Sequence, residues 1–331
     1  MTDTAELTGL TDETELTGLT YTAELTGLSD TGELAGLTVT AERKWIAMGI
    51  TLENVSYVYE QGTAMQTAAL QGISLEIPDN QFIGLIGHTG SGKSTLVQLL
   101  NGLLRPTSGR VLYNGKDIHE DGFDKKALRA NVGLVFQYPE HQLFEVDVLS
   151  DVMYGPKNLG LDEATCKKRA IQALENVGMK EKYFKTSPFD LSGGQKRRAA
   201  IAGVLAMNPR ILILDEPTAG LDPRGRDEIL GLISEMKKKL SMTIILVSHS
   251  MDDVARYVER IVVMGHGKKV FDDTPRNVFK HYIELEDLGL SAPQITYIMN
   301  TLRDYGMDVH TDALTVEEAA AEILRAAKRQ P

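Results

Sequence analysis

The stretch Gly-His-Thr-Gly-Ser-Gly-Lys-Ser at residues 87–94 follows a short apolar run and opens a segment with helical spacing. Glycines let successive backbone N–H groups converge on phosphate oxygens without an intervening side chain, and a helix N-terminus adds a favourable dipole. Strand, loop and helix in this order therefore predict a site for the phosphates of a nucleotide. We expect Lys93 to bridge the β- and γ-phosphates and Ser94 to bind Mg²⁺. The residues predicted to hold the nucleotide here are Gly87, His88, Thr89, Gly90, Ser91, Gly92, Lys93, Ser94 and Thr95.

A second apolar run, residues 211–214, ends in two adjacent carboxylates, Asp215 and Glu216. At the carboxyl end of a strand, we expect Asp215 to hold Mg²⁺ through water and Glu216 to polarise the attacking water as a general base. The pair is a weak signal by itself, because many buried strands end in acids at a solvent boundary. Beside the loop at 87–94, it predicts an enzyme that hydrolyses its nucleotide rather than only binding it.

The composition is that of a globular protein, with 331 residues of which 42% are hydrophobic and 24% charged. The longest nearly apolar run, residues 199–207, is far shorter than the roughly 20 residues that span a bilayer, so we expect no membrane-spanning segment. Residues 1–40 contain eight acidic residues and no Lys or Arg, and so supply −8 of the net charge of −11. The remainder is nearly balanced, which argues against a general nucleic-acid surface. The single cysteine, Cys166, excludes an internal disulfide and is expected on a helix surface.

The first part of the chain is a repeat. Glu-Leu-Thr-Gly-Leu begins at residues 6, 15 and 24, and Glu-Leu-Ala-Gly-Leu begins at residue 33, so the period is nine. Regular glycine and threonine oppose a stable helix, and the segment lacks the basic residues of a signal or transit peptide. We therefore predict a disordered low-complexity arm over residues 1–47 and a folded part that begins near residue 48.

Strand and helix patterns alternate from residue 50 to about residue 285. Strand-like runs occupy residues 50–59, 73–77, 82–86, 132–136, 211–214, 243–247 and 261–264, and helical patterns occupy residues 94–104, 163–177, 195–207 and 223–240. Buried strands that alternate with helices predict an α/β fold with a largely parallel sheet. Later, residues 293–305 and 315–328 predict two amphipathic helices in a C-terminal extension over residues 286–331.

A third motif, Leu-Ser-Gly-Gly-Gln at residues 191–195, stands immediately before a helical pattern. Its serine can be a simple helix N-cap, or its hydroxyl and the glycine amides can form a second anion-binding helix terminus. The motif lies between the loop at 87–94 and the acidic pair at 215–216, and this order resembles the ATP-binding cassette (ABC) ATPases. The resemblance covers about residues 50–285.

The resemblance implies a P-loop NTPase fold, with the ABC ATPase domain over residues 48–285 and a helical signature subdomain at about 138–205. Gln137 matches the Q-loop glutamine, Asp222 ends a match to the D-loop, and His249 matches the switch histidine. Tyr59 is placed like the aromatic residue that stacks on adenine, and Tyr57 is the competing candidate.

In the ABC family two cassettes face each other head to tail, and the signature of each completes the ATP site of the other. The resemblance therefore implies a dimer in which Ser192 and Gly194 touch the γ-phosphate bound by the partner. The implied signature contacts are Ser192, Gly193, Gly194 and Gln195. The implied catalytic residues are Lys93, Gln137, Glu216 and His249, and the implied metal ligands are Ser94, Gln137 and Asp215. His249 would contact the γ-phosphate of its own site, and Gln137 would link Mg²⁺ and the attacking water to the transporter interface.

Residues 137–144, Gln-Tyr-Pro-Glu-His-Gln-Leu-Phe, resemble the Q-helix segment of energy-coupling factor (ECF) vitamin and metal importers. Residues 187–195, 202–207 and 250–255 resemble the second ATPase subunit of that family. This resemblance implies an ATPase that uses ATP and Mg²⁺ at the cytoplasmic face of the membrane. Its implied partners are a second ATPase subunit, a transmembrane coupling subunit and a small substrate-binding membrane protein. The C-terminal extension of the family mediates contact between the ATPase subunits.

Three alternatives remain open. The chain can be the ATPase of a conventional or cobalt/nickel ABC importer that works as a homodimer, a soluble ABC ATPase outside transport, or a non-hydrolysing module. Soluble ABC ATPases usually carry two cassettes or a long coiled coil, whereas Lys93 and Ser192 are only 99 positions apart without sustained heptads. The basic runs at 196–198 and 237–239 are expected on solvated helix faces, so no nucleic-acid partner is predicted. The presence of Glu216 and His249 favours hydrolysis.

Overall fold

The computed structural model describes residues 22–25, 37–40 and 49–328, and it divides between residues 48 and 49 into two units. In the first unit, β1 (Thr22–Leu25) pairs antiparallel with β2 (Leu37–Thr40). The other residues of the predicted arm lie outside the described part of the chain. The prediction that residues 1–47 are a disordered arm therefore stays a prediction, apart from this short pair of strands.

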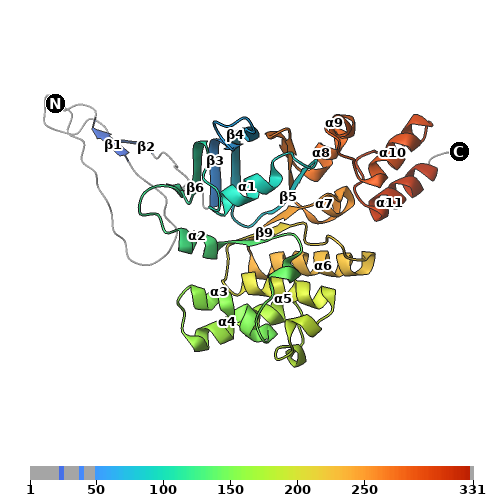
Figure 1. The fold of residues 1–331 in the computed structure, drawn as a ribbon. Helices are drawn as coiled ribbons and strands as arrows, with labels where there is room; N and C mark the ends of the chain where they lie inside the picture. The colour runs from blue at the N-terminus through green and yellow to red at the C-terminus, as the bar shows by residue number, and fades with distance from the viewer. Residues whose placement is uncertain (1–21, 26–36, 41–48, 329–331) are drawn as a thin grey trace. The chain divides into compact units, whose positions relative to one another are not determined.

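The second unit is built on a six-stranded sheet in the order β12-β11-β5-β10-β9-β8. Two of its strands, β5 and β9, are labelled in Figure 1. Its strands are β5 (Phe82–Gly87), β8 (Val132–Val135), β9 (Ile211–Asp215), β10 (Thr243–Val247), β11 (Arg260–Gly265) and β12 (Lys268–Asp273). Neighbouring strands run parallel except β12, which pairs antiparallel with β11. The predicted α/β fold with a largely parallel sheet is thus confirmed. The inner strands are almost continuously apolar because both faces of the sheet are covered.

A second, antiparallel sheet has the order β4-β3-β6-β7. Its strands are β3 (Gly49–Tyr59), β4 (Thr67–Pro78), β6 (Ser108–Tyr113) and β7 (Lys116–Asp117). This sheet, helix α1 (Lys93–Leu100) and one face of the central sheet share a core, to which the central strands contribute alternate residues such as Ile83, Leu85, Ile211 and Ile213. The sequence predicted the two longer strands but neither β6 nor β7. The predicted helix at 94–104 is shorter in the structure and ends at Leu100.

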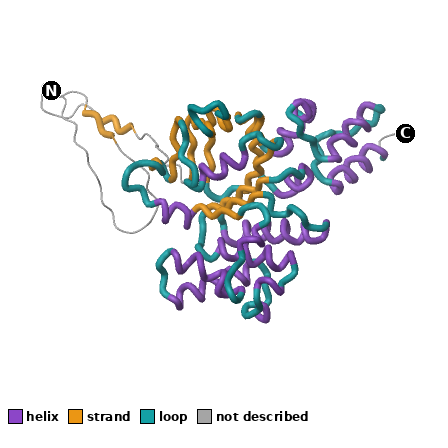
Figure 2. The backbone as a smooth tube through the Cα atoms, viewed as in Figure 1, coloured by secondary structure: helices purple, strands orange, loops and turns teal. Residues whose placement is uncertain are grey.

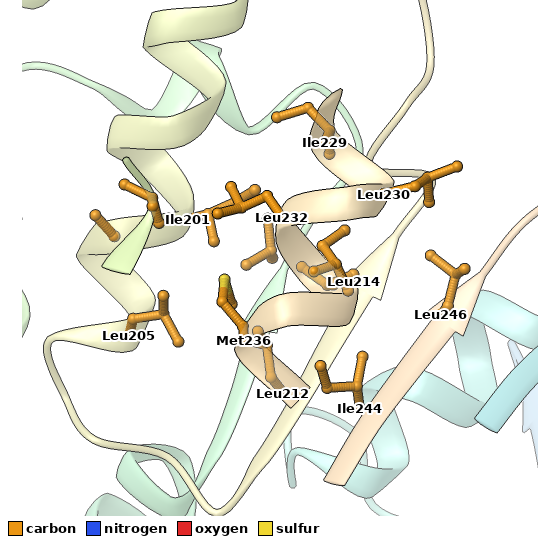
Figure 3. Close-up of a cluster of buried hydrophobic side chains, with 14 of the residues drawn as sticks. Ile201, Leu205, Leu212, Leu214, Ile229, Leu230, Leu232, Met236, Ile244 and Leu246 are labelled. Carbon is orange, nitrogen blue, oxygen red and sulfur yellow. The ribbon is translucent and has the colours of Figure 1, made fainter. Parts of the chain in front are cut away.

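The other face of the central sheet is covered by helices (Figure 2). These include α5 (Gly193–Leu205), α6 (Pro223–Leu240) and α7 (Met251–Tyr257). Leu212 and Leu214 of β9 and Ile244 and Leu246 of β10 point toward α5 and α6, where they meet Ile201, Leu205, Ile229 and Met236 (Figure 3). Each such side chain contributes about 1.5–3 kcal/mol when it is fully buried. These contacts fix helix α5 and the end of β9 relative to each other.

Between β8 and β9 the described chain forms only helices and turns: η1 (Pro139–Gln142), α3 (Val148–Asn158), α4 (Glu163–Asn176), η2 (Glu181–Tyr183), η3 (Pro188–Asp190) and α5. Cys166, on α4, is fully buried, so the prediction of a surface thiol is wrong. Asp162 and Asp147 cap the starts of α4 and α3 by accepting hydrogen bonds from backbone N–H groups.

The remaining helices are α2 (Lys125–Asn131), α8 (Pro275–Lys280), α9 (Tyr282–Asp287), α10 (Gln294–Asp304) and α11 (Val316–Ala327). The last two correspond to the helices predicted at 293–305 and 315–328. They share a small core of their own, which includes Ile295, Met299 and Ala326. Whether this extension holds two ATPase subunits together stays a prediction.

Candidate ATP site

Four of the predicted motifs lie at the carboxyl ends of four neighbouring parallel strands. The phosphate loop follows β5, His249 follows β10, Asp215 ends β9, and Gln137 follows β8. In open α/β sheets, ligands bind in the crevice beyond the carboxyl ends of the strands. The topology therefore brings motifs that are far apart in the sequence to one edge of the sheet.

The loop after β5 has a backbone that suits glycine. Gly92 has φ +101°, and a Cβ added there would lie 2.5 Å from the carbonyl oxygen of Ala69. Gly90 also has a positive φ, but an added Cβ would meet no described atom within 4 Å, so this side of the loop is open to a ligand. The hydroxyl of Ser91 is buried and has no hydrogen-bond partner among the residues the structure describes. Ser94 is exposed in the first turn of α1, where it can reach a metal ion.

Lys93 is 7% exposed, and its Nζ donates to the carbonyl oxygens of Gly87 at 2.6 Å and His88 at 3.1 Å. Burial lowers the pKa of Lys93, while the charges of Glu216 and Asp215 oppose that shift. The ammonium group thus lies inside the loop, held by acceptors that phosphate oxygens can replace.

Asp215 and Glu216 are adjacent carboxylates, and the positive charge of Lys93 acts on both. Burial raises the pKa of Asp215, and Lys93 opposes the shift. Burial and then the charge of Asp215 raise the pKa of Glu216 to about 7, against the pull of Lys93. The Oε1 of Glu216 is buried without a hydrogen-bond partner in the described part of the chain. One lysine beside two crowded carboxylates fits a divalent cation such as Mg²⁺, which uses one or two carboxylates together with substrate phosphates.

The switch histidine lies beside the acidic pair. His249 Nε2 is 3.2 Å from Oε1 of Glu216, although the two atoms do not have the geometry of a hydrogen bond. Burial, followed by the charge of Lys93, lowers the pKa of His249, which favours its neutral form. The structure thus places His249, Glu216, Asp215 and Lys93 in one cluster.

The two candidate tyrosines differ in their surroundings. The hydroxyl of Tyr59 lies 3.1 Å from Oγ1 of Thr95 in α1, and the side chain is 39% exposed. Tyr57 packs against the core under the antiparallel sheet and meets the ring of Tyr59 edge to face, with 4.8 Å between the centroids. Only Tyr59 therefore combines an exposed ring with a position beside the phosphate loop.

The signature motif is both a helix cap and an open surface. Ser192 caps α5: its hydroxyl accepts from the backbone N–H of Gln195, and the Gln195 side chain accepts from the backbone N–H of Ser192. At Gly193 and Gly194, however, an added Cβ would meet no described atom within 4 Å. Packing within this chain does not demand glycine there, so approach by a ligand from outside explains it better. Asp222, likewise exposed, caps α6 and accepts from Gly225 N at 2.6 Å.

Sequence reasoning missed one buried charge. The basic run at 196–198 was predicted on a solvated face, and for Arg197 that is wrong, because this residue is only 1% exposed. Its guanidinium is paired with Glu140 of η1. The signal was present in the helical spacing, since residues 197, 201 and 205 share one face of α5 and the latter two are apolar.

Comparisons with known proteins agree with this geometry. Residues 70–219 match the ABC transporter family model. The chain is 54% identical over 278 residues to the energy-coupling factor transporter ATP-binding protein EcfA2 of Caldanaerobacter subterraneus subsp. tengcongensis, covering 84% of this chain and 97% of that relative. The chain belongs to this family of transporter ATP-binding proteins. It is therefore an ABC ATPase, which confirms the resemblance and the expected enzyme class.

Other members of the ECF ATPase family and of the wider ABC superfamily give the same result. The EcfA2 protein of Clostridioides difficile is 52% identical over 280 residues, with 84% of this chain and 97% of the relative covered. The structure of cbiO1 from Clostridium perfringens, described as part of the ABC transporter complex cbiONQ, is 40% identical with a TM-score of 0.66, covering 77% of this chain and 99% of that one. A dimeric ATP-binding cassette in a post-hydrolysis state with ADP and Pi is 29% identical with a TM-score of 0.60, covering 68% and 98%.

Proposed function

We propose that this protein hydrolyses ATP as one of two ATPase subunits of an ECF importer for a vitamin or a transition-metal ion. The observation that carries the proposal is the convergence of the phosphate loop, Asp215, Glu216 and His249 at one sheet edge, in a chain about half identical to EcfA2 proteins. The role in a transporter is inferred from the named relatives, and ATP hydrolysis is inferred from the geometry of the site.

In the proposed mechanism, Lys93 exchanges the carbonyl oxygens of Gly87 and His88 for the β- and γ-phosphate oxygens of ATP. Ser94, Asp215 and Gln137 would hold Mg²⁺, which neutralises charge on the phosphates when it is bound. Glu216, once ionised, accepts a proton from the attacking water, because its free Oε1 has no other partner among the described residues. His249, neutral and beside Glu216, contacts the γ-phosphate, and Tyr59 stacks on the adenine ring.

A single chain does not complete this site. We propose that Ser192, Gly193, Gly194 and Gln195 bind the nucleotide of a second ATPase subunit, and that Asp222 lies at the same contact. The open space beside the two glycines and the exposed start of α5 support this role. A dimeric relative with ADP and Pi has the same fold. The C-terminal pair α10 and α11 is proposed to add to the contact between the subunits.

None of the described helices is long and apolar enough to cross a bilayer. A hollow of about 530 Å³ lies between α3, α5 and residues 142–144. At its rim Phe144 and Tyr154 are 57% and 45% exposed and meet edge to face. We propose that a helix of a transmembrane coupling subunit binds here, so that the protein is peripheral at the cytoplasmic face of the membrane. The cargo is bound by a separate small membrane protein.

The test is a gentle detergent pull-down of the full chain from its native membranes, with identification of the co-purifying proteins by mass spectrometry. Recovery of a second ABC ATPase, one multi-span subunit and small hydrophobic proteins supports the proposal. Recovery of the chain with a conventional permease pair and no second ATPase indicates a homodimeric importer instead. Recovery of no membrane protein at all contradicts a transport function and leaves the ATPase chemistry standing.

A further inference from the structure

One buried guanidinium joins three elements around the site. Arg197 of α5 donates from Nε and Nη2 to the two carboxylate oxygens of Glu140, at 3.1 and 2.7 Å. Its Nη1 donates to the backbone carbonyl oxygens of Pro217 at 3.0 Å and Ala219 at 2.8 Å. Because the guanidinium is planar and rigid, these four bonds fix η1, α5 and the turn after β9 in one arrangement.

The turn that Arg197 holds is the one that orients the general base. Glu216 has φ +50°, a conformation that is uncommon for a residue with a side chain and persists only where its surroundings enforce it. Its N–H donates to Val247 and its carbonyl accepts from the N–H of Ala219, each at 3.1 Å. Arg197 binds the carbonyl oxygens of Pro217, inside this turn, and of Ala219, at its end. A shift of the guanidinium therefore changes the direction of the Glu216 side chain.

Glu140, the ion-pair partner of Arg197, lies close in the sequence to the proposed contact with the membrane subunit. Glu140 lies three residues after Gln137 and three before Leu143, which lines the hollow between α3 and α5. Burial raises the pKa of Glu140, but the hydrogen bonds and charge of Arg197 outweigh it and hold the pKa below its ordinary value. The carboxylate is thus ionised at neutral pH, and its side chain is 18% exposed. Displacement of residues 137–144 would pull on Arg197 directly.

We propose that Arg197 is a positioning residue that transmits movement of residues 137–144 to the Glu216 turn, and so sets the rate of hydrolysis. The inference rests on the proposed function for the origin of that movement, whereas its effect on hydrolysis needs only the ATPase. A buried ion pair that serves stability alone would lower the melting temperature when broken but leave turnover by the folded enzyme unchanged.

The test compares Glu140→Gln with Asp272→Asn in the purified transporter complex. Both substitutions remove the charge of a carboxylate that binds an arginine through two oxygens, and the two carboxylates are similarly buried, with side chains 18% and 17% exposed. The Arg260–Asp272 pair, however, joins β11 to β12 away from the turn. We expect Glu140→Gln to lower kcat for ATP about 3- to 30-fold with KM changed less than about twofold, the range of couplings carried by such networks. Asp272→Asn should leave kcat within about twofold.

Arg197→Lys completes a double-mutant cycle with Glu140→Gln. If both residues act through one link, the double variant should lose little more activity than either single variant. Equal kcat for Glu140→Gln and wild type, or losses in kcat that multiply in the double variant, would overturn the inference. If the wild-type complex hydrolyses ATP but takes up no cargo, only the proposed importer function is refuted. The comparison of kcat values still decides the role of Arg197.

Discussion

Glu216→Gln should separate catalysis from stability, because the carboxylate that we propose to activate water also destabilises the nucleotide-free fold when it ionises. The ordinary pKa of a glutamate is 4.5, whereas that of Glu216 is raised to about 7 by burial and by Asp215. Each pH unit between these values corresponds to about 1.4 kcal/mol, so the ionised form costs the fold about 3.5 kcal/mol at most. Because the Glu216 side chain is 16% exposed to solvent, we expect about 1–2 kcal/mol.

The sign of the pH dependence follows from the raised pKa. The folded protein holds the Glu216 proton more tightly than the unfolded chain, so stability is lost as pH rises from about 4.5 through about 7. Glutamine does not ionise. Glu216→Gln should therefore match wild type below about pH 4.5, gain stability relative to it across this window, and keep a constant advantage above it.

The assay is urea unfolding of the nucleotide-free protein in EDTA at several pH values, followed by ATP binding and turnover. Glu76→Gln, which makes the same chemical change at an exposed residue of β4, is the control. In turnover, Glu216→Gln should retain ATP binding and lose about 10²–10⁴-fold in kcat. A stability difference that does not change with pH would refute the assigned electrostatics, and unchanged hydrolysis would remove Glu216 from the role of base.

Three further predictions concern single contacts. Gly92→Ala should abolish binding of a fluorescent ATP analogue, because the added Cβ would clash with the backbone of Ala69. Gly62→Ala is the control and should bind the analogue normally, because Gly62 also has a positive φ but an added Cβ there would meet no described atom within 4 Å. Tyr59→Ala should raise KM for ATP about 5- to 150-fold, which corresponds to the loss of one base-stacking contact. Tyr57→Ala should instead lower the unfolding midpoint. The opposite pattern would indicate that Tyr57, and not Tyr59, stacks on adenine. Gly194→Ala should leave ATP binding unchanged, should not lower the melting temperature because alanine favours the helix, and should reduce hydrolysis at least about tenfold. Normal hydrolysis would argue against a signature role in trans.

Much of the fold and site was predictable because the information is local. The phosphate loop and the acidic pair each consist of a buried strand followed by polar residues, so a short window defines both the strand and the chemistry at its end. The antiparallel sheet was less visible: in β6 only Val111 is buried, and a single buried residue gives no alternation to detect. The choice between Tyr57 and Tyr59 also needed the structure, since both lie on one strand and only their packing differs.

Arg197 was misjudged for a different physical reason. A charged residue is normally solvated, because burial without partners costs several kcal/mol. Here the four acceptors come from Glu140, Pro217 and Ala219, 57, 20 and 22 residues away. The helical spacing could have placed Arg197 on the apolar face of α5, but no local pattern identifies the distant groups that satisfy its charge.

The glycines give the most direct support to the proposal that one chain is only part of the working site. Gly92 must be glycine for an internal reason, since a side chain there would strike the backbone of Ala69. Gly193 and Gly194 have no such reason: they lie in the first turn of α5, where alanine would favour the helix by nearly 1 kcal/mol per residue. Keeping glycine at a cost in stability makes sense only if something outside the chain approaches the backbone at this point. A phosphate held by a second ATPase subunit has the charge that this helix start attracts.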